Sequence, residues 1–261
     1  MKTSILAVAA LLVCSAVQAD TIAQTCSKHS PAHTVALLEL YTSEGCDSCP
    51  PADTFVSGLR GSGMTSEQVV PLSMHVDYWD YIGWKDLFAK AAFTERQRWL
   101  SNNAGSRTIY TPELFIGGHE LRGGVGGWRG AVPAAVKRIN DRPARADISI
   151  ALGRPAAGNL PVEVSAITTQ DAQSGKLFVA VVENGLRSVV KAGENRGVTL
   201  KHDYVVRQWL GPIALADRKA SLVTNVPLPS GATAGNLGVV AFLQSNQGEI
   251  LQALMQPLCG G

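Results

Sequence analysis

The stretch YTSEGCDSCPPAD, residues 41–53, decides the fold of this chain. An apolar run over 35–38 leads into it and an amphipathic helical pattern follows it, so Cys46 and Cys49 lie where a strand gives way to a helix. Two prolines directly after Cys49 are tolerated only in the first turn of a helix, where an N–H group would have no partner. The helix is therefore predicted to begin at the cysteines.

This position predicts a chemistry for the two cysteines. Unpaired N–H groups and the positive end of the helix dipole favour a thiolate at Cys46, the residue nearer the exposed end. Such a thiolate attacks a disulfide, and Cys49 can resolve the mixed disulfide that forms. Glu44 and Asp47 flank Cys46, and their negative charge opposes the thiolate. We predict a redox-active Cys46–Cys49 disulfide whose potential depends on which effect is larger.

Residues 1–19 have the pattern of a secretory signal peptide. Lys2 supplies the positive end, Ile5–Val13 the apolar core, and Val17–Ala19 a cleavage site with small residues before Asp20. The mature protein is thus expected to be periplasmic or secreted. No other stretch is long and apolar enough to span a bilayer. The full chain of 261 residues has a net charge of only +2, which gives no basis for nucleic-acid binding.

Cleavage of the signal peptide would leave four cysteines, an even number in an exported protein. Cys26 and Cys259 lie near the two ends of the mature chain, and an oxidising compartment would favour a disulfide between them. The alternative is two unrelated thiols, because sequence does not measure the distance between them.

Residues 20–33 are polar and are expected to form an N-terminal tether. Residues 34–41 follow as a buried strand, interrupted by Glu39. A carboxylate so close to the cysteines could accept a proton from Cys49 during exchange. The alternative is a residue at the end of the strand that reaches solvent.

A second apolar run over 69–76 predicts a strand parallel to the first, joined to it by a right-handed crossover. Four aromatic residues crowd the next eight positions, and we single out Tyr78, Trp79 and Trp84 among them. They either fill space between the sheet and the helix predicted at 87–100, or form an aromatic wall beside the cysteines that binds substrate.

The sequence from 109 to 124 predicts a proline, a strand, a two-glycine hairpin and a second strand. Pro112 stands at the first position of that strand, where proline is allowed. The residues that follow, 127–140, carry apolar side chains on one stripe and predict a closing helix.

The order of these elements over 34–142 resembles the thioredoxin fold with an inserted helix. The resemblance depends on Cys46-Asp47-Ser48-Cys49-Pro50 and on Thr111-Pro112 before the hairpin. It implies that the peptide bond before Pro112 is cis, that Pro112 faces the cysteines, and that Thr111 contacts the substrate backbone.

A closer resemblance extends over essentially the whole mature chain. YTSEGCDSCPPAD, HVDYWDYIGWKD and GENRGVTLKHDYVVR together look like a family of secreted bacterial thioredoxin-like proteins labelled as a domain of unknown function. This resemblance implies a fold and a location but no substrate.

The pattern changes from residue 145 onward. Short alternating runs are separated by Gly, Pro, Asn and Ser, which is typical of an antiparallel, immunoglobulin-like β-sandwich of about seven strands over 145–261. The boundary between two domains is expected at Asp141–Pro143. The polar loop Gly193–His202 either reaches the cysteines or only connects strands, and His202 is interpreted as a loop histidine rather than a ligand.

These patterns favour an exported thiol–disulfide oxidoreductase that acts on protein thiols or disulfides, or with a redox partner, and needs no cofactor. One alternative is copper(I) binding or delivery through Cys46, Cys49 and His75, since soft sulfur ligands select copper(I). The other is a non-catalytic binding module in which the Cys46–Cys49 disulfide is structural.

Overall fold

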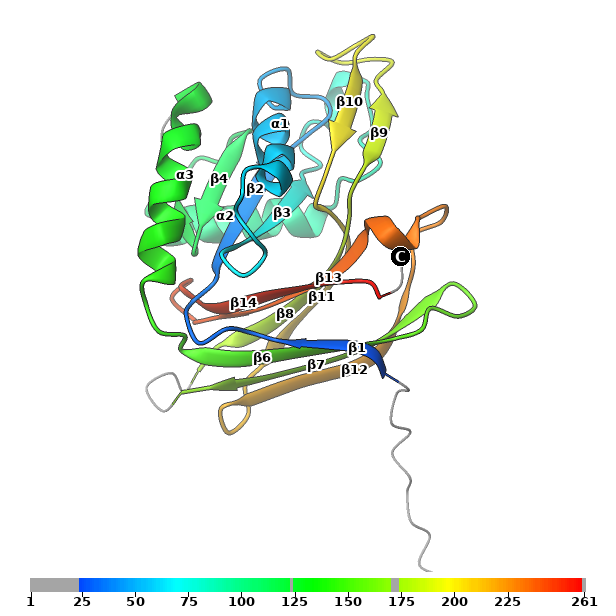
Figure 1. The fold of residues 1–261 in the computed structure, drawn as a ribbon. Helices are drawn as coiled ribbons and strands as arrows, with labels where there is room; N and C mark the ends of the chain where they lie inside the picture. The colour runs from blue at the N-terminus through cyan, green and yellow to red at the C-terminus, as the bar shows by residue number, and fades with distance from the viewer. Residues whose placement is uncertain (1–23, 123, 170–173, 260–261) are drawn as a thin grey trace, which may run out of the picture.

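A computed structural model of the chain describes residues 24–122, 124–169 and 174–259. The fold is mixed α/β, with a large mixed sheet, a separate antiparallel sheet and a two-stranded hairpin (Figure 1). The predicted signal peptide lies outside the described residues. The described helices are α1 (Pro50–Gly58), α2 (Ala91–Asn103) and α3 (Gly124–Asn140), with 3₁₀ turns at Leu59–Gly61, Asp80–Ile82 and Ala234–Asn236. The described strands are β1 (Gln24–His29), β2 (Ala36–Thr42), β3 (Val69–His75), β4 (Glu113–Ile116), β5 (His119–Glu120), β6 (Ala146–Gly153), β7 (Asn159–Thr168), β8 (Lys176–Glu183), β9 (Leu186–Val189), β10 (Thr199–His202), β11 (Val205–Ala214), β12 (Lys219–Pro227), β13 (Leu237–Gln244) and β14 (Ile250–Pro257).

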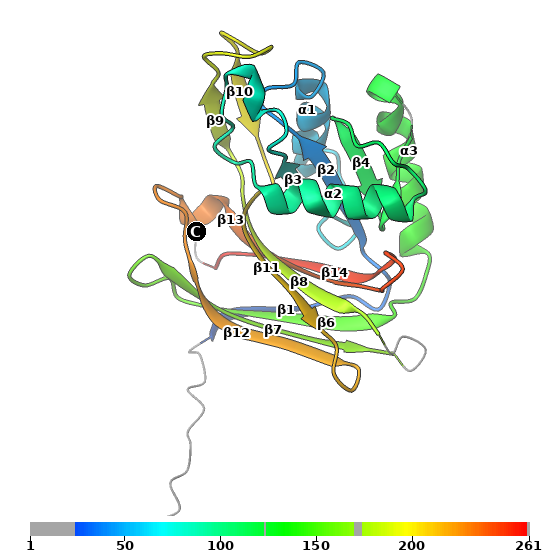
Figure 2. The same ribbon diagram turned by 180° about the vertical axis from the view of Figure 1, so that it is seen from behind.

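The elements up to α3 confirm the predicted order. β2 pairs in parallel with β3 and antiparallel with β4, and the hairpin from β4 to β5 turns at Gly117 and Gly118, both with positive φ. Helices α1 and α3 cover one face of these strands, and α2 covers the other (Figures 1 and 2). The helix predicted at 87–100 is displaced toward the C-terminus, because residues 85–90 continue the preceding loop.

All seven strands predicted after residue 145 are present, as β6, β7, β8 and β11 to β14. The prediction of a tether over 20–33 is wrong for Gln24–His29, which form β1 and pair antiparallel with β6 at the edge of the four-stranded sheet. Its polar sequence suits an edge strand that is only partly buried. The hairpin of β9 and β10 was also not predicted.

The large sheet runs through both parts of the chain, in the order β14-β13-β8-β11-β3-β2-β4-β5. Its two parts join where Val205 of β11 lies opposite Ser73 of β3. Ser73 donates its N–H to Tyr204 O at 2.9 Å and its hydroxyl to Asp203 O at 2.9 Å. The division into two domains at 141–143 stays a prediction, since the sheet is continuous across it.

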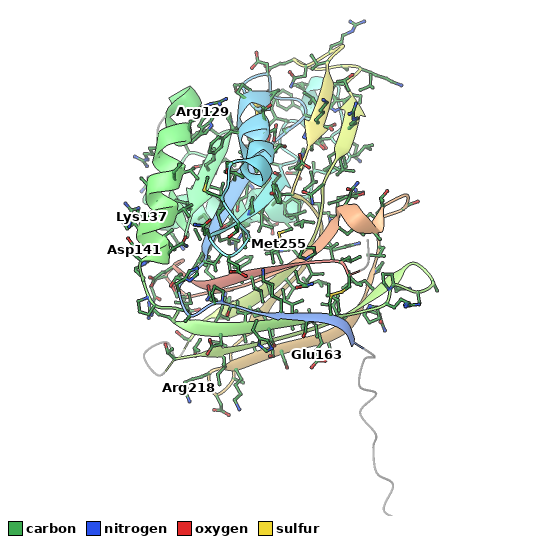
Figure 3. All side chains as sticks on the ribbon, in the orientation of Figure 1. Arg129, Lys137, Asp141, Glu163, Arg218 and Met255 are labelled. Atoms are coloured by element: carbon green, nitrogen blue, oxygen red, sulfur yellow. A yellow bond between two sulfur atoms is a disulfide. The ribbon has the colours of Figure 1, made fainter. Side chains whose placement is uncertain are left out.

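Alternating side chains of β8 enter two different apolar cores. Phe178 and Val182 face the core shared with the helices, where Met255 of β14 also packs, whereas Val179 and Val181 face the four-stranded sheet. Figure 3 shows Met255 between the layers and the charged residues of α3 on its outer surface. Both faces of this strand are buried, so its sequence is apolar throughout rather than alternating.

The same alternation determines the position of Glu39. Thr42 faces α1 and donates its hydroxyl to Asp53, whereas Glu39 and Tyr41 lie on the opposite face, toward α2. There Glu39 accepts hydrogen bonds from Arg96 Nε at 2.6 Å and Nη2 at 3.1 Å. Glu39 is fully buried, so it neither reaches solvent nor faces the cysteine helix, and both of its predicted roles are wrong.

We expect Arg96→Ala to lower the free energy of unfolding by about 3–5 kcal/mol, because it leaves the buried Glu39 carboxylate without its partner. Arg98→Ala, at an exposed position of the same helix, is the matched control and should change the free energy of unfolding by at most about 0.5 kcal/mol. Urea unfolding at neutral pH measures both. Equal effects would show that the Glu39–Arg96 pair does not hold α2 to the sheet.

Candidate redox site

Cys46 and Cys49 form a disulfide at the start of α1, with their Cα atoms 5.5 Å apart. Cys49 is the N-cap, the two prolines occupy the first helical positions, and Asp53 donates its N–H to Cys49 O at 3.1 Å. The predicted helix start and cysteine pairing are confirmed. Both cysteines are 0% exposed.

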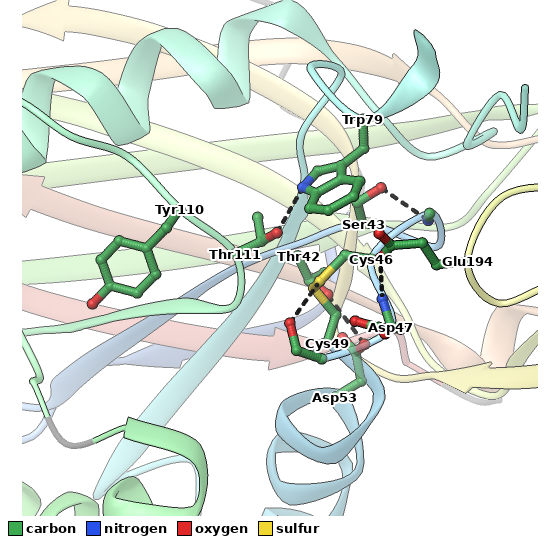
Figure 4. Close-up of a disulfide and its surroundings, with 12 residues drawn as sticks. Thr42, Ser43, Cys46, Asp47, Cys49, Asp53, Trp79, Tyr110, Thr111 and Glu194 are labelled. Atoms are coloured by element: carbon green, nitrogen blue, oxygen red, sulfur yellow. Dashed lines mark hydrogen bonds between the residues drawn. A yellow bond between two sulfur atoms is a disulfide. The ribbon is translucent and has the colours of Figure 1, made fainter. Parts of the chain in front are cut away.

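Two residues of the predicted aromatic wall lie near the disulfide loop. Trp79 donates its indole N–H to Thr111 Oγ1 at 2.7 Å, beside the disulfide (Figure 4). Trp84 donates its indole N–H to Glu44 Oε2 at 2.8 Å, and Tyr78 packs against the apolar core. The peptide bond from Thr111 to Pro112 is cis, as the resemblance to thioredoxin implies.

The β9–β10 hairpin fixes the disulfide loop from the other side. Asn195, buried in the turn of the hairpin, donates its side-chain amide to Glu44 O at 2.9 Å and to Cys46 O at 2.8 Å. Its neighbour Glu194 accepts the N–H of Asp47 at 3.0 Å (Figure 4). Of the two predicted roles for the loop 193–202, contact with the cysteines is therefore correct.

Five ionisable residues are buried next to this loop, and we call them the histidine–carboxylate cluster. They come from five segments of the fold, which are the disulfide loop, α1, β3, the loop before α2 and β10: Glu44, Asp53, His75, Asp86 and His202. His75 Nδ1 and Asp86 Oδ2 are 2.6 Å apart, and His202 Nε2 lies 3.3 Å from Glu44 Oε1. The rings of His75 and His202 meet edge to face at 5.0 Å. The prediction of His202 as a loop histidine is wrong, because it is a buried member of this cluster.

Charge interactions within the cluster shift its pKa values. Burial raises the pKa of Asp53, and the charges of His202 and His75 offset part of that rise. Burial disfavours the charged form of His75, but Asp86, Asp53 and Glu44 outweigh it and raise the pKa of this ring. Burial alone would raise the pKa of Asp86, yet the interaction with His75 lowers it. His75 and Asp86 are thus stabilised as an ion pair.

A known protein family matches most of this chain. The model of a family described as "Protein of unknown function (DUF1223)" matches residues 37–244, which include the cysteines, the cluster and the hairpin. The chain belongs to the DUF1223 family. Curated proteins yield no match.

Two solved structures share the DUF1223 fold described above. Protein AGR_C_4864 from Agrobacterium tumefaciens is 24% identical, with a TM-score of 0.62, over 89% of this chain and 97% of that one. HBP35 of Porphyromonas gingivalis is 18% identical, with a TM-score of 0.67, over 89% of this chain and 77% of that one. At these identities the two structures support the fold of this chain and do not indicate a substrate.

The described part of this DUF1223 chain contains no group of three or more His, Cys, Asp or Glu residues arranged to hold a metal ion. His75, the third ligand of the copper(I) alternative, has its Nδ1 bound to Asp86. The observed arrangement therefore adds no support to a copper site at Cys46, Cys49 and His75.

The second predicted disulfide, Cys26–Cys259, is present and links β1 to the end of the described chain, with 6.0 Å between the Cα atoms. Disulfides of this kind persist in oxidising compartments. In residues 24–122, 124–169 and 174–259, no helix is both long and apolar enough to cross a membrane.

Several residues of the site were not predicted from sequence. Asp53, Asp86 and Asn195 are short polar residues in a helix or in loops, and such residues are common on protein surfaces. One signal was available for Asp53, because it follows Cys49 by four positions and must lie on the same side of the helix.

We expect Asp86→Asn to destabilise the protein most between pH 3.8 and 6.5, the ordinary pKa values of the two groups. The pKa of Asp86 is lowered in the folded protein, so its contribution to stability is lost as pH falls through the lowered pKa. The pKa of His75 is raised, so its contribution to stability is lost as pH rises through the raised pKa. Asp86 Oδ2 accepts the N–H of Glu44 and Oδ1 accepts that of Phe88, so the asparagine keeps an acceptor for only one of them, and that loss does not depend on pH.

Urea unfolding of wild type and Asp86→Asn across this pH range tests the expectation. Asp147→Asn, at an exposed strand position, is the control and should show no such maximum. A difference between wild type and Asp86→Asn that is constant with pH would contradict an ion pair.

Proposed function

We propose that this protein is an exported thiol–disulfide oxidoreductase. The observation that carries the proposal is the Cys46–Cys49 disulfide at the N-terminus of α1, with Thr111 beside it (Figure 4). A substrate thiolate attacks Cys46 Sγ, the bond between the two sulfurs breaks, and its electron pair stays on Cys49 Sγ. A second substrate thiolate then displaces Cys46, so the substrate leaves as a disulfide and the protein as a dithiol.

Asp53 replaces Glu39 as the proposed proton donor and acceptor for Cys49. It is buried one helical turn beyond Cys49, and Thr42 donates a hydrogen bond to Oδ2 at 3.1 Å. Its raised pKa keeps a larger fraction of the carboxyl protonated than in an exposed aspartate. A protonated carboxyl can supply the proton that a buried Cys49 sulfur takes up as the disulfide opens.

Protein thiols or a redox partner are the proposed substrates. Trp79 and Trp84 would contribute the aromatic contacts beside the disulfide, with Tyr78 supporting them from the core. Thr111 would contact substrate backbone once its hydroxyl is released from Trp79. A periplasmic or secreted location is supported by the Cys26–Cys259 disulfide.

Burial of both cysteines favours a second candidate, a binding module with a structural disulfide. The reduction potential of Cys46–Cys49 in dithiothreitol or glutathione buffers distinguishes the two. A value of about −120 to −200 mV would be that of a disulfide oxidant or isomerase, whereas one below about −300 mV is typical of structural disulfides.

Catalysis through Cys46 requires the disulfide loop to become accessible, and Asn195→Ala should favour the accessible state. Loss of the two hydrogen bonds to Glu44 O and Cys46 O would cost the closed state about 1–3 kcal/mol. We therefore expect reduction by dithiothreitol to become roughly 5- to 150-fold faster. Asn225→Ala, exposed on β12, is the control; equal rates in wild type and Asn195→Ala would show that the hairpin does not limit access.

Replacing each cysteine tests the order of the exchange steps. In the reverse direction the reduced protein attacks a peptide disulfide through Cys46, so Cys46→Ala should lower this exchange to the uncatalysed rate. Cys49→Ala should accumulate a mixed disulfide at Cys46, visible by mass spectrometry as added peptide mass. Cys26→Ser with Cys259→Ser controls for loss of a remote disulfide. Normal turnover by Cys46→Ala would exclude this mechanism.

A further inference from the structure

His202 is a buried histidine that takes no part in the exchange steps proposed above. Its side chain is 2% exposed, and neither ring nitrogen makes a hydrogen bond of good geometry to any residue that the structure describes. His75 Nε2 and Glu44 Oε1 are in the same condition. Buried polar groups are nearly always paired, so a cluster of such atoms requires a physical explanation.

The surroundings of His202 suit a group that gains and loses a proton. The carboxylates of Glu44 and Asp53 approach it from the disulfide loop and α1. His75 approaches it from β3 and is itself paired with Asp86 of the loop before α2. Phe88 separates it from Arg207 of β11, a cation that already pairs with Glu183. Carboxylates of the cluster therefore lie on two sides of this imidazole.

The position of His202 connects a proton on its ring to the disulfide. His202 ends β10, which packs against α1, and Asp53 lies on that helix, four residues beyond Cys49. Figure 4 shows the Asp53 carboxylate next to Thr42 and Cys49. Cys49 is 0% exposed in this closed structure, so a neighbouring buried group can supply the proton needed there.

We propose, building on the oxidoreductase function above, that His202 is a positioning residue that holds a proton for Cys49 and passes it through Asp53 when the disulfide opens. The attacking thiolate forms a bond to Cys46 Sγ, the electron pair of the broken bond stays on Cys49 Sγ, and Asp53 gives that sulfur its proton. His202 then protonates Asp53 and recovers a proton from solvent. Closure of the disulfide reverses each transfer.

The test measures the rate of disulfide opening by dithiothreitol at several pH values, with mass spectrometry as the readout. Each rate is divided by the concentration of dithiothreitol thiolate at that pH, which gives a normalised rate constant. In the wild type this normalised rate constant should fall as pH rises and the buried acid loses its proton, by up to about tenfold per pH unit for one proton. In His202→Gln the fall should vanish or move to lower pH by at least about one unit.

His119→Gln is the matched control, since this histidine is exposed in the β4–β5 hairpin, and it should retain the wild-type profile. Superimposed profiles of wild type and folded His202→Gln would overturn the proposal. If circular dichroism shows that His202→Gln does not fold, Asp53→Asn interrupts the same transfer, and a wild-type profile in that variant would overturn it equally.

The two proposals fail in different ways. If the oxidoreductase proposal is wrong, the wild-type protein will show no exchange with peptide thiols, whereas the pH profile of its opening by dithiothreitol can still depend on His202. A wrong role for His202 would leave peptide exchange intact while the profiles of wild type and variant coincide.

Discussion

The joint between β3 and β11 is the constraint on which the rest of the structure depends. Ser73 donates both its N–H and its hydroxyl to the chain just before Val205, and this contact makes one sheet from two parts of the sequence. His75 follows Ser73 by two residues and His202 precedes Val205 by three. The joint therefore brings together the two imidazoles of the buried cluster, and it holds the β9–β10 hairpin over the cysteine loop.

Local sequence signals were sufficient for most of the fold. The helix start was predictable because two prolines after Cys49 leave few alternatives. The positions of β8 and β13 were also predicted, but as alternating runs, whereas both strands are buried on both faces and are apolar along most of their length. Gly117 and Gly118 predicted their hairpin because both adopt positive φ. Each of these signals depends on neighbours in sequence, which a single chain displays.

Signals that depend on distant contacts were not available from sequence. β1 is polar, and only its pairing with β6 makes it a strand. Glu39 has the burial expected of a catalytic carboxylate, but the alternation of β2 directs it to Arg96 on the far side of the sheet. Asn195 and His202 resemble ordinary loop residues until the continuous sheet places them against the cysteine loop.

Burial and reactivity have opposite requirements at this disulfide. A helix N-terminus stabilises a thiolate, whereas a closed apolar environment disfavours one, and Cys46 experiences both. This conflict is smaller if the sulfurs are charged only while the β9–β10 hairpin is displaced, and if they take up a proton from the histidine–carboxylate cluster when the hairpin returns. The hairpin carries both Asn195, which closes the loop, and His202, which faces the buried carboxylates. Because one element carries both, access to Cys46 and proton supply to Cys49 would change together.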